Sequence, residues 1–312
     1  MQTKGSNGNI VVSSDPDPGI AYTGPLVVLT SRQSASASEI FAAALQDYGR
    51  ALIVGDKSTF GKGTVQTILE IGRFTSLLGS RSQEDGALKL TIQKFYRVAG
   101  GSTQLHGVAS DIVLPTLSDL PEYGEGALKN CLPYDEVPRA KYTKWTDSNH
   151  QLFIDELKRR SEARIQTDPE FRYVMEDMER IRHKRDENRI SLNEDIRRKE
   201  MDEDKVRKET RSKERLARQG EDMQMYRLTL DTVDKPNLQL ITFPGKTASL
   251  TKKKVSPEAA PDSDSEFAGD DEDTSKDPVL DPERDETLNI LADLVNLSRG
   301  PTTASTTTTT SH

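Results

Sequence analysis

The chain has 312 residues, a formal charge of -8 and 33% hydrophobic residues, so it is long enough for one or two domains but apolar enough to bury only part of its length. Its one cysteine, Cys131, excludes an internal disulfide framework and a Cys-rich zinc site. No apolar run approaches the length of a membrane span, and the first residues carry no apolar stretch of the signal-peptide type.

The first block, roughly residues 8–115, holds most of the glycine and the β-branched runs. Two short apolar runs at 25–30 and 51–55 flank an Ala-rich helical pattern at 39–45. This order predicts a β-α-β unit with two buried parallel strands and a right-handed crossover. The alternation at 87–98 predicts a half-solvated strand, and the apolar patch at 112–114 predicts one more strand.

From residue 152 to about 227 the sequence interleaves acidic and basic residues and repeats apolar residues at intervals of three and four. This pattern predicts solvent-facing helices with a break at Pro169. A strand-like patch follows at 238–243. Residues 258–286 carry 13 acidic and two basic residues. Residues 256–286, which are rich in Ser, Asp, Glu and Pro, are predicted to be disordered.

The expected fold class is therefore α/β, with parallel strands and a βαβ unit, followed by a mainly α-helical domain and a disordered acidic segment. The expected domains are 1–118 for the α/β core, 119–235 for the helical domain and 236–286 for an irregular acidic linker. A terminal amphipathic helix is expected at 287–298, docked back on the body, and a disordered Thr-rich tail at 299–312.

Ser36 lies where the first predicted strand turns into the helix. With Glu39 three residues later it fits a capping box, which is the ordinary role of a serine in this setting. The same geometry also places a hydroxyl at the carboxyl edge of a parallel sheet, where helix N-terminal amides point at whatever binds. A nucleophilic Ser36 would find the Ala37 N–H ready to donate to an oxyanion.

A nucleophilic serine needs a base, and the histidines are few: His106, His150, His183 and His312. His183 lies in the charged helical region, and His312 is the last residue. His150 opens the helical block. A Ser-His-Asp triad therefore depends on His106 alone, in a turn beside Gly107.

Lys62 is the better candidate for the base. Glycines flank it, and its segment follows the second core strand, so it can return over the sheet edge toward Ser36. A lysine acts as a base near neutral pH only when burial lowers the pKa of its amine. Gln66 can accept one of its protons and orient it. A solvated loop lysine is the alternative.

Other chemistries fit the sequence less well. The stretch from Gly55 to Thr64 resembles a phosphate-binding loop, but its glycine spacing is one residue too long, and Gly63 stands where a Mg²⁺-binding hydroxyl belongs. The charged helices balance their signs and interleave no stacking aromatics, which argues against nucleic acid. Metal-ligand spacing of His, Cys and carboxylates is absent, so no metal site is expected.

Residues 34–40 read SASASEI and residues 59–66 read TFGKGTVQ. This pair of motifs closely resembles the carboxy-terminal processing proteases, in particular their tail-specific branch. Further agreement lies at 47–52 (DYGRAL), 91–98 (TIQKFYRV), 100–104 (GGSTQ) and 132–135 (LPYD). The resemblance covers about residues 10–150 well and the helices loosely.

The resemblance implies that Ser36 is the nucleophile, Lys62 the general base, Gln66 the residue that orients it, and the Ala37 N–H an oxyanion donor. The implied reaction is hydrolysis of peptide bonds through an acyl-enzyme, without metal or cofactor. The implied substrates are proteins with apolar, unstructured C-terminal tails, met in the periplasm of a Gram-negative bacterium, and an adaptor protein is a possible partner.

The sequence departs from the family in two ways. The family pattern GVTPDI appears at 107–112 as GVASDI. The chain also begins after the position of the family's PDZ domain and of its glycine-rich segment, which supplies the other oxyanion donor. The expectation is therefore a C-terminal portion with little peptidase activity alone. The alternative is a non-catalytic interaction fragment that binds a partner through its helical arm.

Overall fold

The computed structural model describes residues 1–17, 19–71, 86–118, 120, 122–145, 151–218, 225–227, 229, 232–233, 237, 239–241 and 281–299. The chain forms two compact units. The first unit contains residues 1–187 together with 281–312, and the second contains residues 188–280. The candidate site residues all belong to the first unit.

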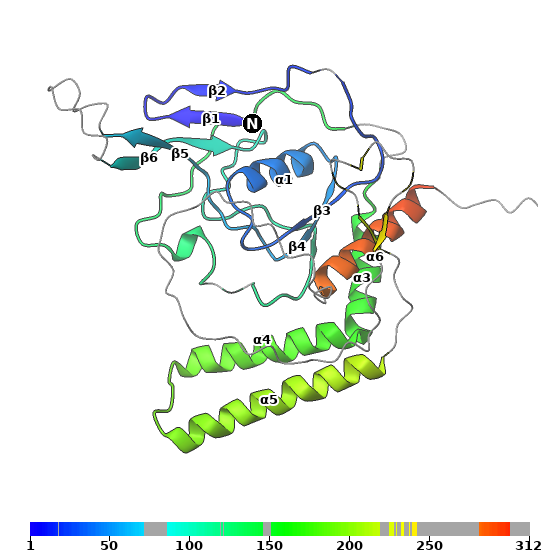
Figure 1. The fold of residues 1–312 in the computed structure, drawn as a ribbon. Coiled ribbons are helices and arrows are strands. Elements are labelled where there is room, and N and C mark those ends of the chain that lie inside the picture. Colours follow the sequence, from blue (N-terminus) through cyan, green and yellow to red (C-terminus); the bar gives the residue numbers. More distant parts are fainter. Residues whose placement is uncertain are drawn as a thin grey trace, which may run out of the picture. The chain divides into compact units, whose positions relative to one another are not determined.

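The centre of the first unit is a parallel sheet (Figure 1). Its strands are β3 (Val27–Thr30), β4 (Leu52–Gly55) and β7 (Ile112–Val113), in the order β3-β4-β7, and both pairings are parallel. The helix α1 (Ala37–Asp47) connects β3 to β4. The predicted β-α-β unit and the predicted strand near residue 112 are therefore confirmed.

The two faces of this sheet are covered by different helices. On one face, Ala42 and Ala43 of α1 pack against Ile53 and Val108, and all four side chains are buried. Small alanines let the helix approach the sheet closely. Because successive strand residues point to opposite faces, Leu52 and Val54 face away from α1.

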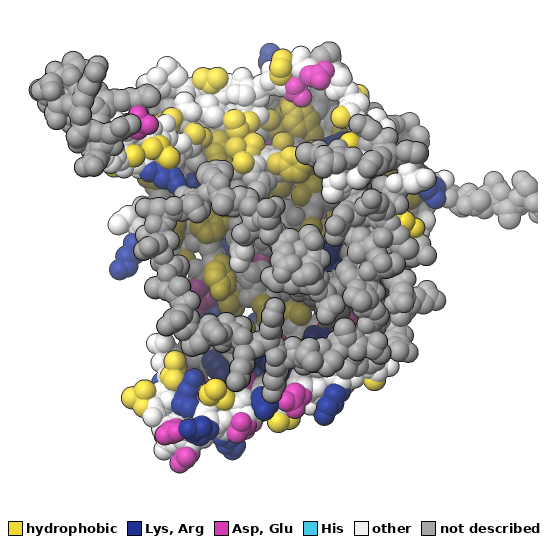
Figure 2. All heavy atoms as spheres, in the orientation of Figure 1, with side chains coloured by type: hydrophobic (Ala, Val, Ile, Leu, Met, Phe, Trp, Pro, Cys, Tyr) yellow, Lys and Arg dark blue, Asp and Glu magenta, His cyan; other side chains and the backbone are white. Residues whose placement is uncertain are grey.

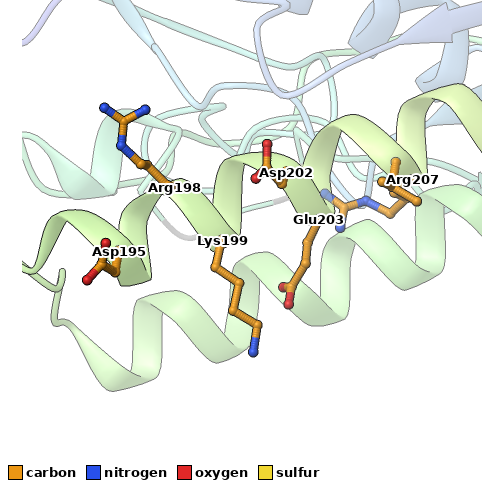
Figure 3. Close-up of a pocket in the computed structure, with 7 residues that line it drawn as sticks. Asp195, Arg198, Lys199, Asp202, Glu203 and Arg207 are labelled. Carbon is orange, nitrogen blue, oxygen red and sulfur yellow. The ribbon is translucent and has the colours of Figure 1, made fainter.

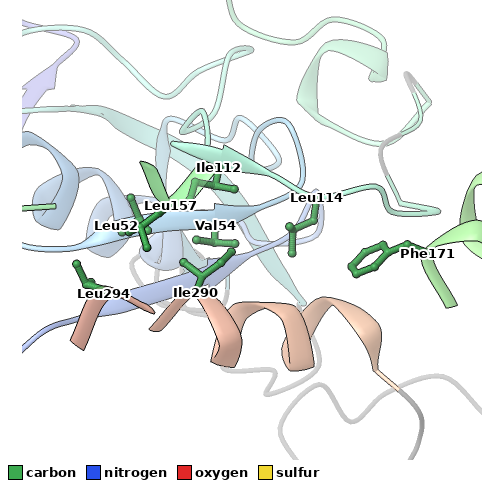
Figure 4. Close-up of a cluster of buried hydrophobic side chains, with 8 residues drawn as sticks. All are labelled: Leu52, Val54, Ile112, Leu114, Leu157, Phe171, Ile290 and Leu294. Atoms are coloured by element: carbon green, nitrogen blue, oxygen red, sulfur yellow. The ribbon is translucent and has the colours of Figure 1, made fainter. Parts of the chain in front are cut away.

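The opposite face packs on α3 (Ile154–Thr167), α4 (Pro169–Glu187) and the terminal helix α6 (Pro282–Ser298). Figure 4 shows this second core cluster. Its buried members are Leu52, Val54, Ile112, Leu114, Leu157, Phe171, Ile290 and Leu294. The sheet is thus buried between α1 and a helical layer built from two helices of the middle of the sequence and one helix near its end.

Ion pairs hold α6 against α3. Arg164 of α3 reaches Glu286 at 2.8 Å and Asp293 at 2.7 Å, and Arg160 reaches Asp293 at 2.9 Å. Ile290 and Leu294, on the same face of α6, are buried in the core. The predicted docking of a terminal helix is confirmed, although the helix begins at Pro282 rather than 287, with Asp281 as its N-cap.

A second sheet is antiparallel throughout, in the order β2-β1-β6-β5. Its strands are β1 (Gln2–Gly5), β2 (Ile10–Val12), β5 (Thr64–Glu70) and β6 (Ala87–Tyr96). The strand predicted at 87–98 is confirmed, whereas β1, β2 and β5 were not predicted. The pattern of QTKG carries no strand signal, and pairing with β6 decides the conformation of β1.

This sheet exposes apolar side chains. Figure 2 shows hydrophobic side chains gathered toward the top of the molecule, where Figure 1 places β1 and β2. The exposed apolar residues of the sheet are Ile10, Val11, Val12, Ile68, Leu88, Leu90 and Ile92. At the other end of β6, Arg97 pairs with Asp47 at 2.5 Å and so ties the end of α1 to this sheet.

The second unit contains α5 (Glu194–Ala217), β8 (Met225–Arg227) and β9 (Gln239–Ile241), the last two paired antiparallel. The helices and the break at Pro169 are confirmed, and so is the strand-like patch near 239. The helical region does not continue to 227 as expected, because α5 ends at Ala217 and Met225–Arg227 is a strand.

Two predictions fall mainly outside the described residues. These are the disordered acidic segment, of which residues 242–280 are not described, and the Thr-rich tail after 299. The prediction of disorder is wrong for residues 281–286, which form the N-cap and first turn of α6. In the part of the chain that is described, no helix combines the length and the apolarity that crossing a membrane requires.

Candidate active site

Ser36 occupies a sharp turn between β3 and α1. The strand β3 ends at Thr30, and α1 begins at Ala37 with Ser36 as its N-cap. Ser36 has φ 58° and ψ -110°, a conformation that residues with a side chain rarely adopt. Strain of this kind costs about 1–3 kcal/mol and gathers at functional sites. The turn holds a half-buried serine at the carboxyl edge of the parallel sheet.

The N-terminus of α1 supplies a hydrogen-bond donor beside this serine. Ala37 is exposed, and within the described residues its N–H donates no hydrogen bond. The first N–H groups of a helix have no partner inside the helix and carry part of its positive dipole. The position predicted for an oxyanion donor therefore has a free N–H group.

The segment between β4 and β5 returns to this turn, as the sequence predicted. The Phe60 N–H donates to the Ser34 carbonyl at 2.9 Å, which joins the two turns directly. Lys62 follows, half-buried, and its Nζ donates to Gln66 Oε1 at 3.1 Å. The structure thus brings the predicted base segment against the nucleophile turn and places Gln66 on the lysine amine.

The carboxylate of Glu39 connects the two turns. Its Oε2 accepts the backbone N–H of Ser36 at 2.9 Å and the backbone N–H of Lys62 at 2.9 Å. Those two nitrogens therefore lie no more than twice that distance apart. The sequence predicted the contact with Ser36 as one half of a capping box, but not the contact with Lys62.

A neighbouring loop supports the lysine segment. Gln104 Oε1 accepts the Gly63 N–H at 2.8 Å, and Thr103 Oγ1 donates to the Lys62 carbonyl at 3.2 Å. The Leu105 N–H donates to the Gly61 carbonyl at 2.8 Å. Residues 100–104 were identified from the sequence only as a match to the family, and their contact with the lysine segment was not predicted. The signal available was the polar run within this stretch, which forms buried hydrogen bonds here.

A second polar link, which the sequence did not reveal, involves Arg32 and Asp56. Asp56 is fully buried after β4, and it accepts hydrogen bonds from the Arg32 N–H at 2.5 Å and from the Ser118 hydroxyl at 2.6 Å. The Arg32 guanidinium donates to the Thr59 carbonyl at 3.0 Å and also to Ser58. The turn that carries Ser36 is therefore fixed at its beginning as well as at its end.

The alternative base, His106, is not brought to Ser36. Its side chain is exposed, and its ring packs edge to face on Tyr134 with the ring centroids 4.6 Å apart. No hydrogen bond joins His106 to Ser36 among the described residues. His183 lies exposed near Glu187 in α4.

In the second unit, a surface hollow follows α5 (Figure 3). Charged side chains of that one helix surround it, among them Asp195, Arg198, Lys199 and Asp202. It contains none of the predicted site residues. Across the described residues, no group of three or more His, Cys, Asp or Glu side chains is placed to hold a metal ion.

The amino-acid sequence of the chain matches two family models. Residues 1–114 match peptidase family S41, and residues 119–296 match the C-terminal domain of tail specific protease. A tail-specific protease of Haemophilus influenzae is 42% identical over 221 residues, which are 70% of this chain and 31% of that protein.

A carboxy-terminal-processing protease of Bartonella bacilliformis is 42% identical over 127 residues, 40% of this chain and 26% of its own length. Among solved structures, the photosystem II D1 C-terminal processing protease is 37% identical in sequence and has a TM-score of 0.24. The match covers 29% of this chain and 20% of that protein's chain. The chain spans about a third or less of the length of the curated relatives that it matches. Because the family models together match most of its length, the chain belongs to the tail-specific proteases of peptidase family S41.

Proposed function

We propose that this chain carries the catalytic dyad of a serine endopeptidase, with Ser36 as nucleophile and Lys62 as general base. The observation that carries the proposal is the shared acceptor: Ser36 and Lys62 both donate their backbone N–H to one oxygen of Glu39. A strained serine turn held close to a lysine segment supports the assignment of the nucleophile and base that acyl transfer requires.

In the proposed reaction, Lys62 accepts a proton in the first half of each step and returns it in the second half. The neutral Lys62 amine takes the proton of the Ser36 hydroxyl as Oγ attacks the peptide carbonyl, and the Ala37 N–H donates to the developing oxyanion. The tetrahedral intermediate collapses to an acyl-enzyme, and the leaving amine takes the proton from Lys62. Water then attacks the acyl group by the same route and releases the free serine.

Gln66 orients the base in this scheme. Its Oε1 accepts one proton of the Lys62 amine at 3.1 Å, which restricts rotation of the amine about its terminal bond. A lysine side chain otherwise carries much rotamer freedom, so a fixed acceptor lowers the cost of aiming its lone pair. No metal or cofactor enters these steps.

We further propose that the substrates are proteins with apolar, unstructured C-terminal tails, that the enzyme acts in the periplasm of a Gram-negative bacterium, and that an adaptor protein takes part. The relatives' names support tail-directed proteolysis. We place the boundary between protease core and helical domain near residue 118.

Labelling with a small fluorophosphonate tests the nucleophile, because it requires an activated serine but no bound peptide. We expect one adduct on Ser36, located by peptide mass spectrometry, and none in Ser36→Ala. Labelling that persists at the same rate in Ser36→Ala would contradict the proposal.

The substrate class has its own test in the same assay. Peptides that end in apolar residues are expected to slow Ser36 labelling by competition, and peptides of equal length that end in acidic residues are expected to leave it unchanged. Equal protection by the two sets, or protection by neither, would contradict the tail preference while leaving the dyad in place.

A further inference from the structure

Glu39 accepts more hydrogen bonds than its place in a helix capping box requires. It is the third residue of α1 and is fully buried. Besides Ser36 and Lys62, which share Oε2, it binds two further donors through Oε1: the Gly61 N–H at 2.7 Å and the Thr59 hydroxyl at 2.6 Å. Three of the four donors come from the lysine segment, more than 19 residues away in the sequence.

We propose, on the basis of the function proposed above, that Glu39 is a positioning residue whose ionised carboxylate sets the separation of the nucleophile and the base. Both reactive residues donate to the same oxygen, so movement of either backbone breaks a charge-assisted hydrogen bond. Acyl transfer is sensitive to such movement, because a displacement of about 1 Å costs about 100-fold in rate.

The donor set requires a carboxylate at this position. An ionised carboxylate is an acceptor only, and here each oxygen accepts two donors. A glutamine of the same shape would place an amide N–H₂ against two of those donors. An aspartate would be one methylene too short to reach the lysine segment. Both the acceptor character of the carboxylate and the length of the Glu39 side chain are therefore required.

Neighbouring contacts keep this carboxylate oriented. The Thr59 hydroxyl donates to Glu39 and accepts the Val108 N–H at 2.8 Å, so its direction is fixed. Burial raises the pKa of Glu39, and its hydrogen bonds with Thr59 and the three backbone N–H groups oppose that rise. As the pH falls, a proton on Glu39 would meet donors that already point at its oxygens.

The two turns have a second link that does not depend on Glu39. The Phe60 N–H donates to the Ser34 carbonyl, and this backbone bond remains when the Glu39 side chain changes. A substitution at Glu39 is therefore expected to alter the fine placement of Ser36 and Lys62 without separating the two segments.

The test is the rate constant for fluorophosphonate labelling of Ser36 in the full chain, measured from pH 5 to pH 9. We expect Glu39→Gln to lower that rate constant by about 10- to 100-fold. In the unsubstituted chain, the rate constant is expected to fall at acid pH as Glu39 takes up a proton. Glu39→Gln has no such proton to take up, so this fall is expected to be absent in the variant. An unchanged rate constant and an unchanged profile in a folded Glu39→Gln would overturn the inference.

Two substitutions of Thr59 keep the inference testable if Glu39→Gln does not fold. Thr59→Val removes one donor to Glu39 and should slow labelling, whereas Thr59→Ser keeps the hydroxyl and should restore most of the rate. Equal rates in Thr59→Val and the unsubstituted chain would overturn the role of the cluster. Absence of Ser36 labelling in the unsubstituted chain is a different outcome, which contradicts the proposed function itself.

Discussion

At the scale of the residue, the backbone of Ser36 is a measurable source of strain. Its φ of 58° suits glycine and disfavours alanine. Ser36→Gly and Ser36→Ala should both abolish labelling. The glycine variant should be more stable than the alanine variant by about 1 kcal/mol, because glycine relieves the strain and is the better N-cap. Urea unfolding of the two variants measures this difference, and a more stable alanine variant would contradict the strained turn.

Gly63 tests the packing of the lysine segment. A Cβ at this position would lie 2.6 Å from Ser102 Oγ and 2.7 Å from the backbone nitrogen of Gln104. Gly63→Ala should therefore lower the free energy of unfolding by about 1–3 kcal/mol. Gly126 is the matched control, since a Cβ there meets no atom within 4 Å. Equal stability of the two alanine variants would show that the segment is loosely packed.

The sequence predicted the candidate site residues that a local motif identifies, but not their contacts with distant residues. The resemblance pointed to Ser36, Lys62 and Gln66. The fold brings the segment that carries Lys62 against the turn that carries Ser36, and Gln66 accepts a hydrogen bond from the Lys62 amine. The full environment of Glu39 was not predictable, because its capping-box pattern accounts for one of its four hydrogen bonds. The other three partners come from residues 59–62, and nothing local in the sequence pairs them with Glu39.

At the scale of the element, Arg164 contributes to the docking of α6 on α3. Glu286 is almost fully buried, and Arg164 is its ion-pair partner. Arg164→Ala leaves that carboxylate without its charge partner and should cost about 2–3 kcal/mol. Arg182→Ala is the control, because its pair with Glu179 is exposed. Thermal unfolding of both variants checks this, and equal melting temperatures would contradict the role of the Arg164 pair.

The first turn of α6 predicts a pH dependence. Burial raises the pKa of Glu283 from 4.5 to about 7, and the negative charges of Asp56 and Asp281 add to the rise. The folded chain therefore holds this proton more tightly than the unfolded chain. The resulting stabilisation is complete below pH 4.5 and is lost as the pH rises through about 7.

Melting temperatures at pH 5 and pH 8 measure this effect. Glu283→Gln carries no charge at either pH, so the fall in melting temperature between the two should be smaller in this variant than in the unsubstituted chain. A fall of equal size in the two proteins would show that Glu283 ionises in the folded state as it does in water.

Among the elements, prediction succeeded where the pattern is strong and local. The β3-α1-β4 unit combines apolar runs with an Ala-rich helix, and the sequence revealed it. The strands β1 and β2 are short. β1 gains its conformation from pairing with β6, more than 80 residues later, and β2 gains its conformation from pairing with β1. Such long-range pairing leaves little trace in a strand's own residues.

At the scale of the whole molecule, the two core clusters of buried hydrophobic residues lie on the two faces of one small parallel sheet. The C-terminal helix α6 completes one of those clusters. The sequence predicted a docked terminal helix, but which sheet face it covers depends on the tertiary structure. The charged helices of the middle region add few buried residues.

The most direct test of the Ser36–Lys62 dyad compares Ser36 labelling in the unsubstituted chain with labelling in Lys62→Ala and Lys94→Ala. Lys94 is a control lysine on β6 that pairs with Asp135. We expect labelling in Lys62→Ala to be slower by a factor of about 100 to 10,000, the usual effect of losing a general base. Lys94→Ala should label at close to the unsubstituted rate. Labelling of Ser36 at the unsubstituted rate in Lys62→Ala would contradict the account.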